Sequence, residues 1–303
     1  MSELGVSYWN AGKLDQALPL FEETVKLMKA KLRPGDRYTM NAMDSLAVCY
    51  RDAGKHDQAL PLYEEMLKLR KAKLGPDHRD TLASMGKLAE SFVSVKNYTE
   101  AETLYRDALN HLRPASSNAP PREVPLLGVI LHHLAGVLWE RKMVSDARLF
   151  AEQATTLYHR HTDWPAGERR HALAVLEAVL KDLGDARDLK AVRLEKVDVL
   201  RAAAEKDDVS ALNELAWLFA TCSDSALRDG RSAVRFAEKA LAKSKAKDWS
   251  ALDTLAAAYA EAGEFAKAAS AQREAIGLCQ DEKTKNDLGT RLKLYESNTP
   301  YRE

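Results

Sequence analysis

Apolar and polar positions recur along the first third of the chain at a fixed interval of 42 residues. Leu4, Leu46 and Leu88 each open the same order of residues. A small residue and an aromatic residue follow each of them closely, and an alanine and a second aromatic residue come later. Self-similarity of this length is typical of a solenoid of supersecondary repeats, which pack on their neighbours and build extended surfaces. The pattern therefore predicts a repeat protein without an enclosed reaction chamber.

Each repeat is predicted to be two antiparallel helices joined by a tight turn. Leu46 and Tyr50 are four residues apart, which places them on one face of a first helix. Gly54 interrupts this pattern and can take the positive φ that such a turn needs. A second apolar stripe that includes Tyr63 follows, and Asp57 is expected to cap the second helix with its carboxylate.

This spacing resembles the tetratricopeptide repeat, whose signature runs L-G-x-x-Y and then A-x-x-x-F. The segment 73–81, KLGPDHRDT, and its counterpart at 31–39 resemble the joints of kinesin-light-chain repeats in particular. Because the usual repeat has 34 residues, both helices are expected to be longer here by about one turn. The resemblance implies an all-α, right-handed superhelical solenoid of about seven helix–turn–helix repeats with a C-terminal capping helix.

The phase of the repeat divides the chain into four segments. Kinesin-light-chain-like repeats are expected over residues 1–113, and an insertion joint with two degenerate repeats over 114–205. Two shorter repeats are expected over 206–280, and a capping helix with its tail over 281–303. The capping helix is predicted from Thr284 to Tyr295, because a solenoid needs a polar outer face over its last apolar one.

The two ends of the chain carry a further expectation. The shorter repeats and the tail resemble the C-terminal repeat arrays of large bacterial signalling proteins, some of which carry a protein kinase domain ahead of the array. Leu4 already occupies the seventh place of a repeat, so the beginning of a first helix is missing. We therefore expect the chain to be a piece of a longer bacterial protein.

Composition narrows the class of partner. Lysine plus arginine equals aspartate plus glutamate at 45 each, which argues against a dedicated surface for nucleic acid or for an anionic membrane. The most apolar run, Val124 to Trp139, is shorter than the ~20 residues that span a bilayer. Cys49, Cys222 and Cys279 are odd in number and far apart, and no signal peptide opens the chain. A reducing, cytoplasmic location is expected.

Catalytic and metal-binding motifs were weighed against packing roles. Neither a glycine-rich phosphate loop nor a G-x-S-x-G element occurs, so we expect no enzyme activity and no cofactor. His132 and His133 would point about 100° apart on a helix and cannot chelate one ion together. His159 and His161 would need an intervening loop to fold over before they could join His171. Packing or solvated roles are favoured for these histidines, and no metal is expected.

What remains is a surface. The resemblance implies that the first helices of the repeats line a concave groove. A protein or peptide segment would lie in this groove, where an aromatic side chain supplies most of the affinity. Trp139 and Trp217 are equally compatible with such an anchor and with simple packing. The candidate binding residues are Asn41, Asp44, Arg51, Lys87, Glu90, His132, Trp139, Asn213 and Trp217.

The sequence thus predicts a protein–protein interaction scaffold whose partner is a protein or peptide, and not nucleic acid or membrane. Two alternatives stay open. The chain could be a purely structural or self-assembly module of a larger multidomain protein, or it could be a sensor of signalling peptides.

Overall fold

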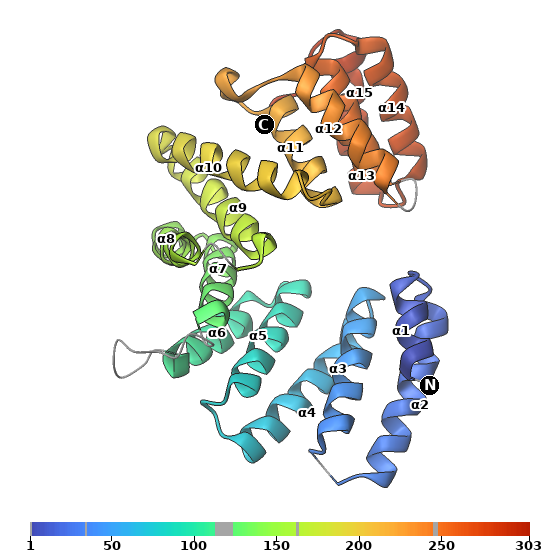
Figure 1. The fold of residues 1–303 in the computed structure, drawn as a ribbon, viewed down its shortest axis with the longest axis vertical. Coiled ribbons are helices and arrows are strands. Elements are labelled where there is room, and N and C mark those ends of the chain that lie inside the picture. Colours follow the sequence, from blue (N-terminus) through green and yellow to red (C-terminus); the bar gives the residue numbers. More distant parts are fainter. Residues whose placement is uncertain (1, 34, 113–123, 162–163, 245–247) are drawn as a thin grey trace. The chain divides into compact units, whose positions relative to one another are not determined.

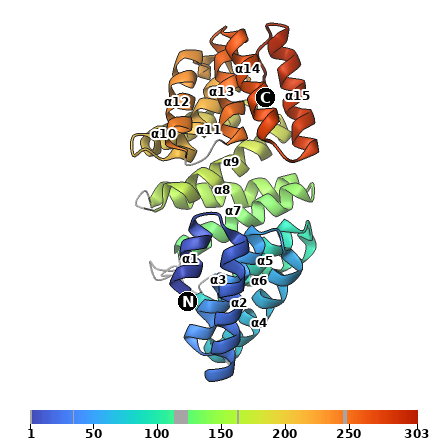
Figure 2. The ribbon, with the colours of Figure 1, turned by 90° about the vertical axis from the view of Figure 1, so that its right-hand side faces the viewer.

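The computed structural model describes residues 2–33, 35–112, 124–161, 164–244 and 248–303. Over these residues the chain is built from helices without any strand (Figures 1 and 2). It forms two compact parts, which we call the N-terminal unit (1–184) and the C-terminal unit (185–303). The all-α class predicted from the sequence is confirmed.

The N-terminal unit is a row of helical hairpins followed by one further helix, α9, which packs on α7 and α8 (Figure 1). Each first helix packs on its own second helix, and each second helix packs on the next first helix. The helices are α1 (Ser2–Asn10), α2 (Leu14–Lys31), α3 (Arg37–Asp52), α4 (His56–Leu74), α5 (Arg79–Ser94), α6 (Tyr98–Leu112), α7 (Val124–Glu140), α8 (Val144–Arg160) and α9 (Ala166–Leu183).

The residues of the repeat pattern form the core of these hairpins. Ala47 on α3 and Ala59 on α4 have no exposed surface, so the two helices approach closely. Phe21, Tyr63 and Tyr105 occupy equivalent places on α2, α4 and α6 and are all buried. Burial of each large side chain contributes roughly 2–3 kcal/mol. The aromatic position of the repeat therefore supplies much of the packing within the row.

The turns between paired helices use left-handed backbone, as expected. Gly12 and Gly54 have φ values of 72° and 70° in the first two hairpins. Lys96 and Lys142 take the same place in the next two hairpins with φ values of 59° and 64°. A side chain in this region costs roughly 1–2 kcal/mol, so these two turns are less favourable locally than the first two.

One detail of the turn was predicted wrongly. Helix α4 begins at His56 with Lys55 as its N-cap, and no side chain caps it. The tight turn starts the helix earlier than the pattern suggested, so Asp57 lies inside the first turn. There its carboxylate still interacts favourably with the positive end of the helix dipole.

In the C-terminal unit, helices α11 to α14 are short and alanine-rich, and the unit ends in a capping helix, α15 (Glu282–Glu296), close to the predicted bounds. Leu288 and Tyr295 of α15 are buried against the preceding helices. The chain then returns to α11, where the backbone N–H of Glu303 donates to the carbonyl of Thr221 at 3.0 Å. The elements are α10 (Ala186–Ala204), α11 (Val209–Thr221), η1 (Ser225–Leu227), α12 (Gly230–Lys243), α13 (Trp249–Glu261), α14 (Phe265–Leu278) and α15 (Glu282–Glu296).

Two expectations concern particular segments. The predicted insertion joint, whose Pro- and Ser-rich part covers 113–122, lies outside the described residues. The apolar run from Val124 to Trp139 forms α7, the first helix of the fourth hairpin. Within the described ranges, no helix combines the length and the apolar character needed to cross a membrane.

Candidate binding groove

First helices of the N-terminal unit are joined by ion pairs between the candidate residues. Lys87 Nζ on α5 lies 2.6 Å from a carboxylate oxygen of Asp44 on α3. Arg51 on α3 lies 3.6 Å from Glu90 on α5. Since all four side chains keep some contact with water, each pair stabilises the fold by about 1 kcal/mol or less. Their main effect is to fix where positive and negative side chains lie along this face.

A cavity of about 470 Å³ opens beside these pairs, between α5, α7 and α9. Val93, Val137 and Val175 line it, one from each of the three helices. Cavities of roughly 300–1,000 Å³ with mostly apolar walls are typical of ligand sites. Of the candidate residues, Glu90, His132 and Trp139 lie in its wall. The remaining lining residues are Tyr98, His133, Gly136, Glu140, His171 and Ala174.

Three polar side chains of the cavity wall have pKa values shifted from their usual ones. Burial lowers the pKa of His132 to about 3 and that of His133 to about 4, so both rings are neutral near pH 7. Burial also raises the pKa of Glu90, against the opposing effects of Arg51 and then Lys87. A hydrogen bond of 3.1 Å joins the Tyr105 hydroxyl to His133 Nδ1 and fixes that ring in the wall.

Trp139 is presented to the cavity while its polar edge is held by α9. Its Nε1 donates a 2.6 Å hydrogen bond to Asp182, and the ammonium of Lys142 lies 5.8 Å from the ring centroid. Trp9 donates in the same way to Asp52 at 2.8 Å. The bond to Asp182 orients Trp139, so its apolar surface can contact a ligand with little loss of rotamer freedom.

Three other candidates lie elsewhere. Asn41 is exposed on α3, where its backbone carbonyl accepts a hydrogen bond from Ser45. Asn213 and Trp217 belong to α11 of the C-terminal unit. There Trp217 Nε1 donates to Glu303 at 2.7 Å, and its ring lies 6.0 Å from that of Tyr301. The C-terminal tail of the chain therefore covers the Trp217 position.

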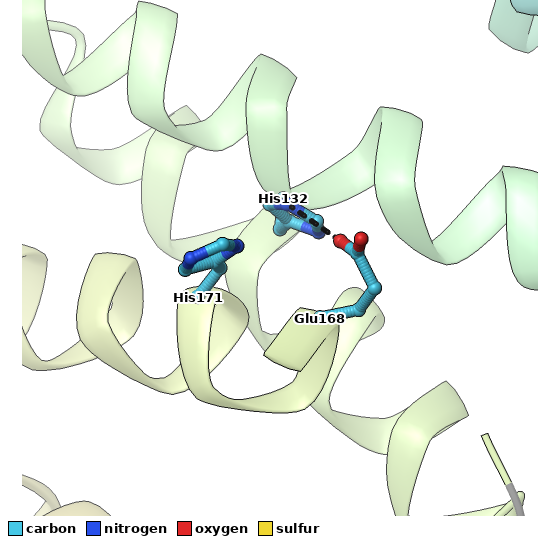
Figure 3. Close-up of side chains that lie close together, drawn as sticks. All are labelled: His132, Glu168 and His171. Atoms are coloured by element: carbon cyan, nitrogen blue, oxygen red, sulfur yellow. Dashed lines mark ion pairs between the residues drawn. The ribbon is translucent and has the colours of Figure 1, made fainter. Parts of the chain in front are cut away.

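The structure also brings together three residues that sequence reasoning did not combine. His132 on α7 and both Glu168 and His171 on α9 point toward one another (Figure 3). One ligand-type atom from each lies within 4.8 Å of the other two. His132 is buried, Glu168 is half-buried and His171 is exposed. Such a set could hold a metal ion.

The class of the protein follows from this fold and from its similarity to known proteins. Residues 1–72 and 38–113 match the tetratricopeptide repeat family model. No curated protein sequence matches the chain. The family match covers residues 1–113, and over most of its length the chain is similar in fold to a solved tetratricopeptide repeat protein.

Solved structures extend the likeness in fold. The chain is similar to the kinesin light chain TPR-like repeats of Podosopora anserina, with 19% identity, a TM-score of 0.56, and coverage of 67% of this chain and 94% of that one. BtubC (BKLC) from P. vanneervenii is 20% identical, with a TM-score of 0.56, and the match covers 67% of this chain and 78% of that one. The apo form of the quorum sensor NprR from B. thuringiensis is 14% identical, with a TM-score of 0.63, and the match covers 91% of this chain and 74% of that one. In fold the chain is thus similar to kinesin-light-chain repeats, as predicted.

Proposed function

We propose that the N-terminal unit is a scaffold that binds a segment of a partner protein along its first helices. An apolar or aromatic side chain of this segment enters the cavity between α5, α7 and α9 and packs on Trp139. The observation that carries the proposal is the mostly apolar cavity of about 470 Å³ in the face of a tetratricopeptide repeat protein. The proposal includes no catalytic step.

The charge of the wall defines the chemistry of the partner segment further. The described lining carries the carboxylates Glu90 and Glu140 but neither lysine nor arginine. Arg51 and Lys87 nearby are already paired with acidic groups. A lysine or arginine that flanks the apolar anchor would therefore find an unneutralised carboxylate in Glu140. We expect partner segments to combine a large apolar residue with a basic neighbour.

A second candidate is a sensor of short signalling peptides. It is favoured by the similarity in fold to the quorum sensor NprR, which extends over 91% of this chain. The two candidates differ in the ligand, because a free short peptide has charged termini that a site can read, whereas an internal segment of a protein has none.

Selection from a random peptide library on the full chain tests the proposal. We expect the selected peptides to share a large apolar or aromatic residue next to a lysine or arginine. Glu140→Lys should weaken their binding at least about tenfold, since a like charge replaces the attraction. Glu23→Lys on the exposed face of α2 is the matched control and should leave binding unchanged.

Capping the peptide termini separates the two candidates. Equal binding of acetylated and amidated peptides supports the scaffold, and loss of binding on capping supports the sensor. Acidic peptides, or peptides that bind Glu140→Lys as well as they bind the unaltered chain, would contradict both.

A further inference from the structure

The cluster of His132, Glu168 and His171 has features that a packing role does not explain. The ring of His132 is 2% exposed, and the ring Nε2 is buried without a hydrogen-bond partner among the described residues. A carboxylate oxygen of Glu168 lies 3.7 Å from this nitrogen, too far for a hydrogen bond. A buried polar atom without a partner is destabilising. His132 Nε2 is therefore a buried acceptor that faces the other two residues of the cluster.

The tautomer of His132 shows what kind of ligand suits this nitrogen. Its Nδ1 lies 3.1 Å from the carbonyl oxygen of Gly128, and a carbonyl can only accept. The proton is therefore on Nδ1, and Nε2 presents a lone pair toward the Glu168 carboxylate. A divalent cation between the two would accept the Nε2 lone pair and be attracted by the carboxylate.

The support behind His132 is arranged as behind a metal ligand. In metal sites the second ring nitrogen of a histidine usually donates to a carbonyl or carboxylate, which fixes the tautomer and the ring orientation. Gly128 supplies that carbonyl, and the Tyr158 hydroxyl lies 3.4 Å from the same Nδ1. A Cβ at Gly128 would come within 3.0 Å of the Tyr158 side chain. A larger residue would therefore disturb this support.

The distances suit a small divalent ion. Two ligands at the usual 2.0–2.2 Å from a tetrahedral Zn²⁺ lie about 3.4 Å apart. The His132–Glu168 separation of 3.7 Å and the 4.8 Å limit for the cluster are slightly larger. Small rotamer changes of half-buried Glu168 and exposed His171 would close the difference. Two imidazoles and one carboxylate are a ligand set that Zn²⁺ and its neighbours among transition metals prefer over Ca²⁺ or Mg²⁺.

We propose that His132, Glu168 and His171 form a binding site for a divalent transition-metal ion of the Zn²⁺ type. Three protein ligands leave a fourth position, and this position is directed to the cavity, because His132 and His171 also line its wall. The ion would join α7 to α9 and neutralise Glu168. This site does not depend on the proposed binding of a partner segment.

Metal titration of the full chain tests the site. After treatment with a chelator, the chain is titrated with Zn²⁺ by calorimetry and with Co²⁺ by visible absorption. We expect one ion per chain and the intense visible bands of tetrahedral Co²⁺. His171→Ala and Glu168→Gln should each weaken binding at least about 100-fold, because the loss of an outer-shell partner already costs 10–100-fold.

Two further variants exclude a general structural effect. His171→Cys supplies a thiolate, another ligand of Zn²⁺, and should restore binding and shift the Co²⁺ spectrum. His111→Ala removes a histidine of α6 that pairs with Asp77 outside the cluster, and it should leave binding unchanged. Equal affinity in His171→Ala and the unaltered chain, or equal loss in His171→Ala and His171→Cys, would overturn the proposal. So would absence of binding to the unaltered chain.

Discussion

At the scale of single residues, backbone conformation shows where a substitution should stabilise the N-terminal unit. Lys96 has a φ of 59° in a turn where the equivalent residues of the first two hairpins are glycines. The left-handed conformation costs an L-residue roughly 1–2 kcal/mol. Glycine avoids this cost but loses roughly 0.5–1 kcal/mol of extra freedom on folding. The first effect is the larger one, so glycine is the better residue at this place.

Lys96→Gly is therefore expected to stabilise the protein by about 0.5–1 kcal/mol. The same change at Lys68, an exposed position in the interior of α4, should destabilise it by about 1 kcal/mol. Urea unfolding followed by circular dichroism measures both. Destabilisation by Lys96→Gly would show that the turn gains more from its lysine than the backbone loses.

The partly buried carboxyl of Glu90 predicts a dependence of stability on pH. Burial raises its pKa in the folded chain, so folding favours the protonated form. The stabilisation that this gives is complete below the ordinary pKa of a glutamate and is lost as the pH rises through the raised value.

Comparison with Glu90→Gln isolates this effect. The free energy of unfolding of the unaltered chain minus that of the variant should fall as the pH rises from about 4 and then level off. Urea unfolding at a series of pH values measures the difference. A difference that grows with pH would mean that Arg51 and Lys87 outweigh burial.

At the scale of elements, the capping helix of the C-terminal unit is held by one buried network. Asp253 on α13 accepts from Gln272 Nε2 on α14 at 2.8 Å and from Arg291 Nε on α15 at 3.0 Å. The pair formed by Asp253 and Arg291 is largely buried. Three helices therefore depend on one carboxylate.

Arg291→Met should destabilise the C-terminal unit by about 3 kcal/mol, because a buried carboxylate loses its cation. The double variant Asp253→Asn with Arg291→Met should recover much of the loss. Arg273→Met, which breaks an exposed pair with Glu296 on the same helices, should cost less than about 1 kcal/mol. The Arg291 guanidinium also lies 5.5 Å from the ring centroid of Trp217 and 5.3 Å from that of Tyr301. Equal losses in Arg291→Met and the double variant would assign the effect to these contacts.

The periodicity of apolar residues predicted the helices well, because helix formation and burial of one helix face depend on residues close together in the sequence. The 42-residue repeat indicated the hairpins and their buried aromatic residues, and the spacing of apolar residues from Thr284 to Tyr295 indicated the capping helix. It did not place Asp57 inside α4, since that depends on the exact geometry of one turn. It also did not show that the tail covers Trp217, a contact between residues 86 positions apart.

The histidine cluster was missed for a similar reason. His171 was considered only with its near neighbours in sequence, His159 and His161, and not with His132 on another helix. A usable signal exists, because Arg51 and Glu90 join two first helices at the same separation in sequence as His132 and His171. Pairs at that spacing mark side chains that meet across the groove.

At the scale of the whole molecule, the chain contains two compact units with separate cores. In a solenoid each repeat depends mainly on its neighbours, so stability is approximately a sum of local contributions. Each unit is therefore expected to hold its fold by its own contacts.

Residues 1–184 and residues 185–303, produced separately, should each fold. Their summed helical signal in circular dichroism should equal that of the full chain, and each should melt cooperatively. A fragment without helical signal would show that its core needs the other unit.

The most direct test of the central claim is to fill the cavity and measure peptide binding. A Cβ at Gly136 would meet only Val175 Cγ2, at 3.9 Å, so Gly136→Leu can extend into the cavity without a clash at its first atom. Leucine is also the better helix former, by about 1 kcal/mol. Gly289→Leu in α15, where a Cβ would meet nothing within 4 Å, is the matched control.

The measurement is the dissociation constant of a library-selected peptide for the full chain and both variants, with a chelator present to exclude effects of metal. The account predicts at least about a tenfold loss of affinity for Gly136→Leu, as for a blocked anchor site. It predicts no change for Gly289→Leu. Equal affinity of all three proteins would place the binding surface away from the cavity and contradict the account.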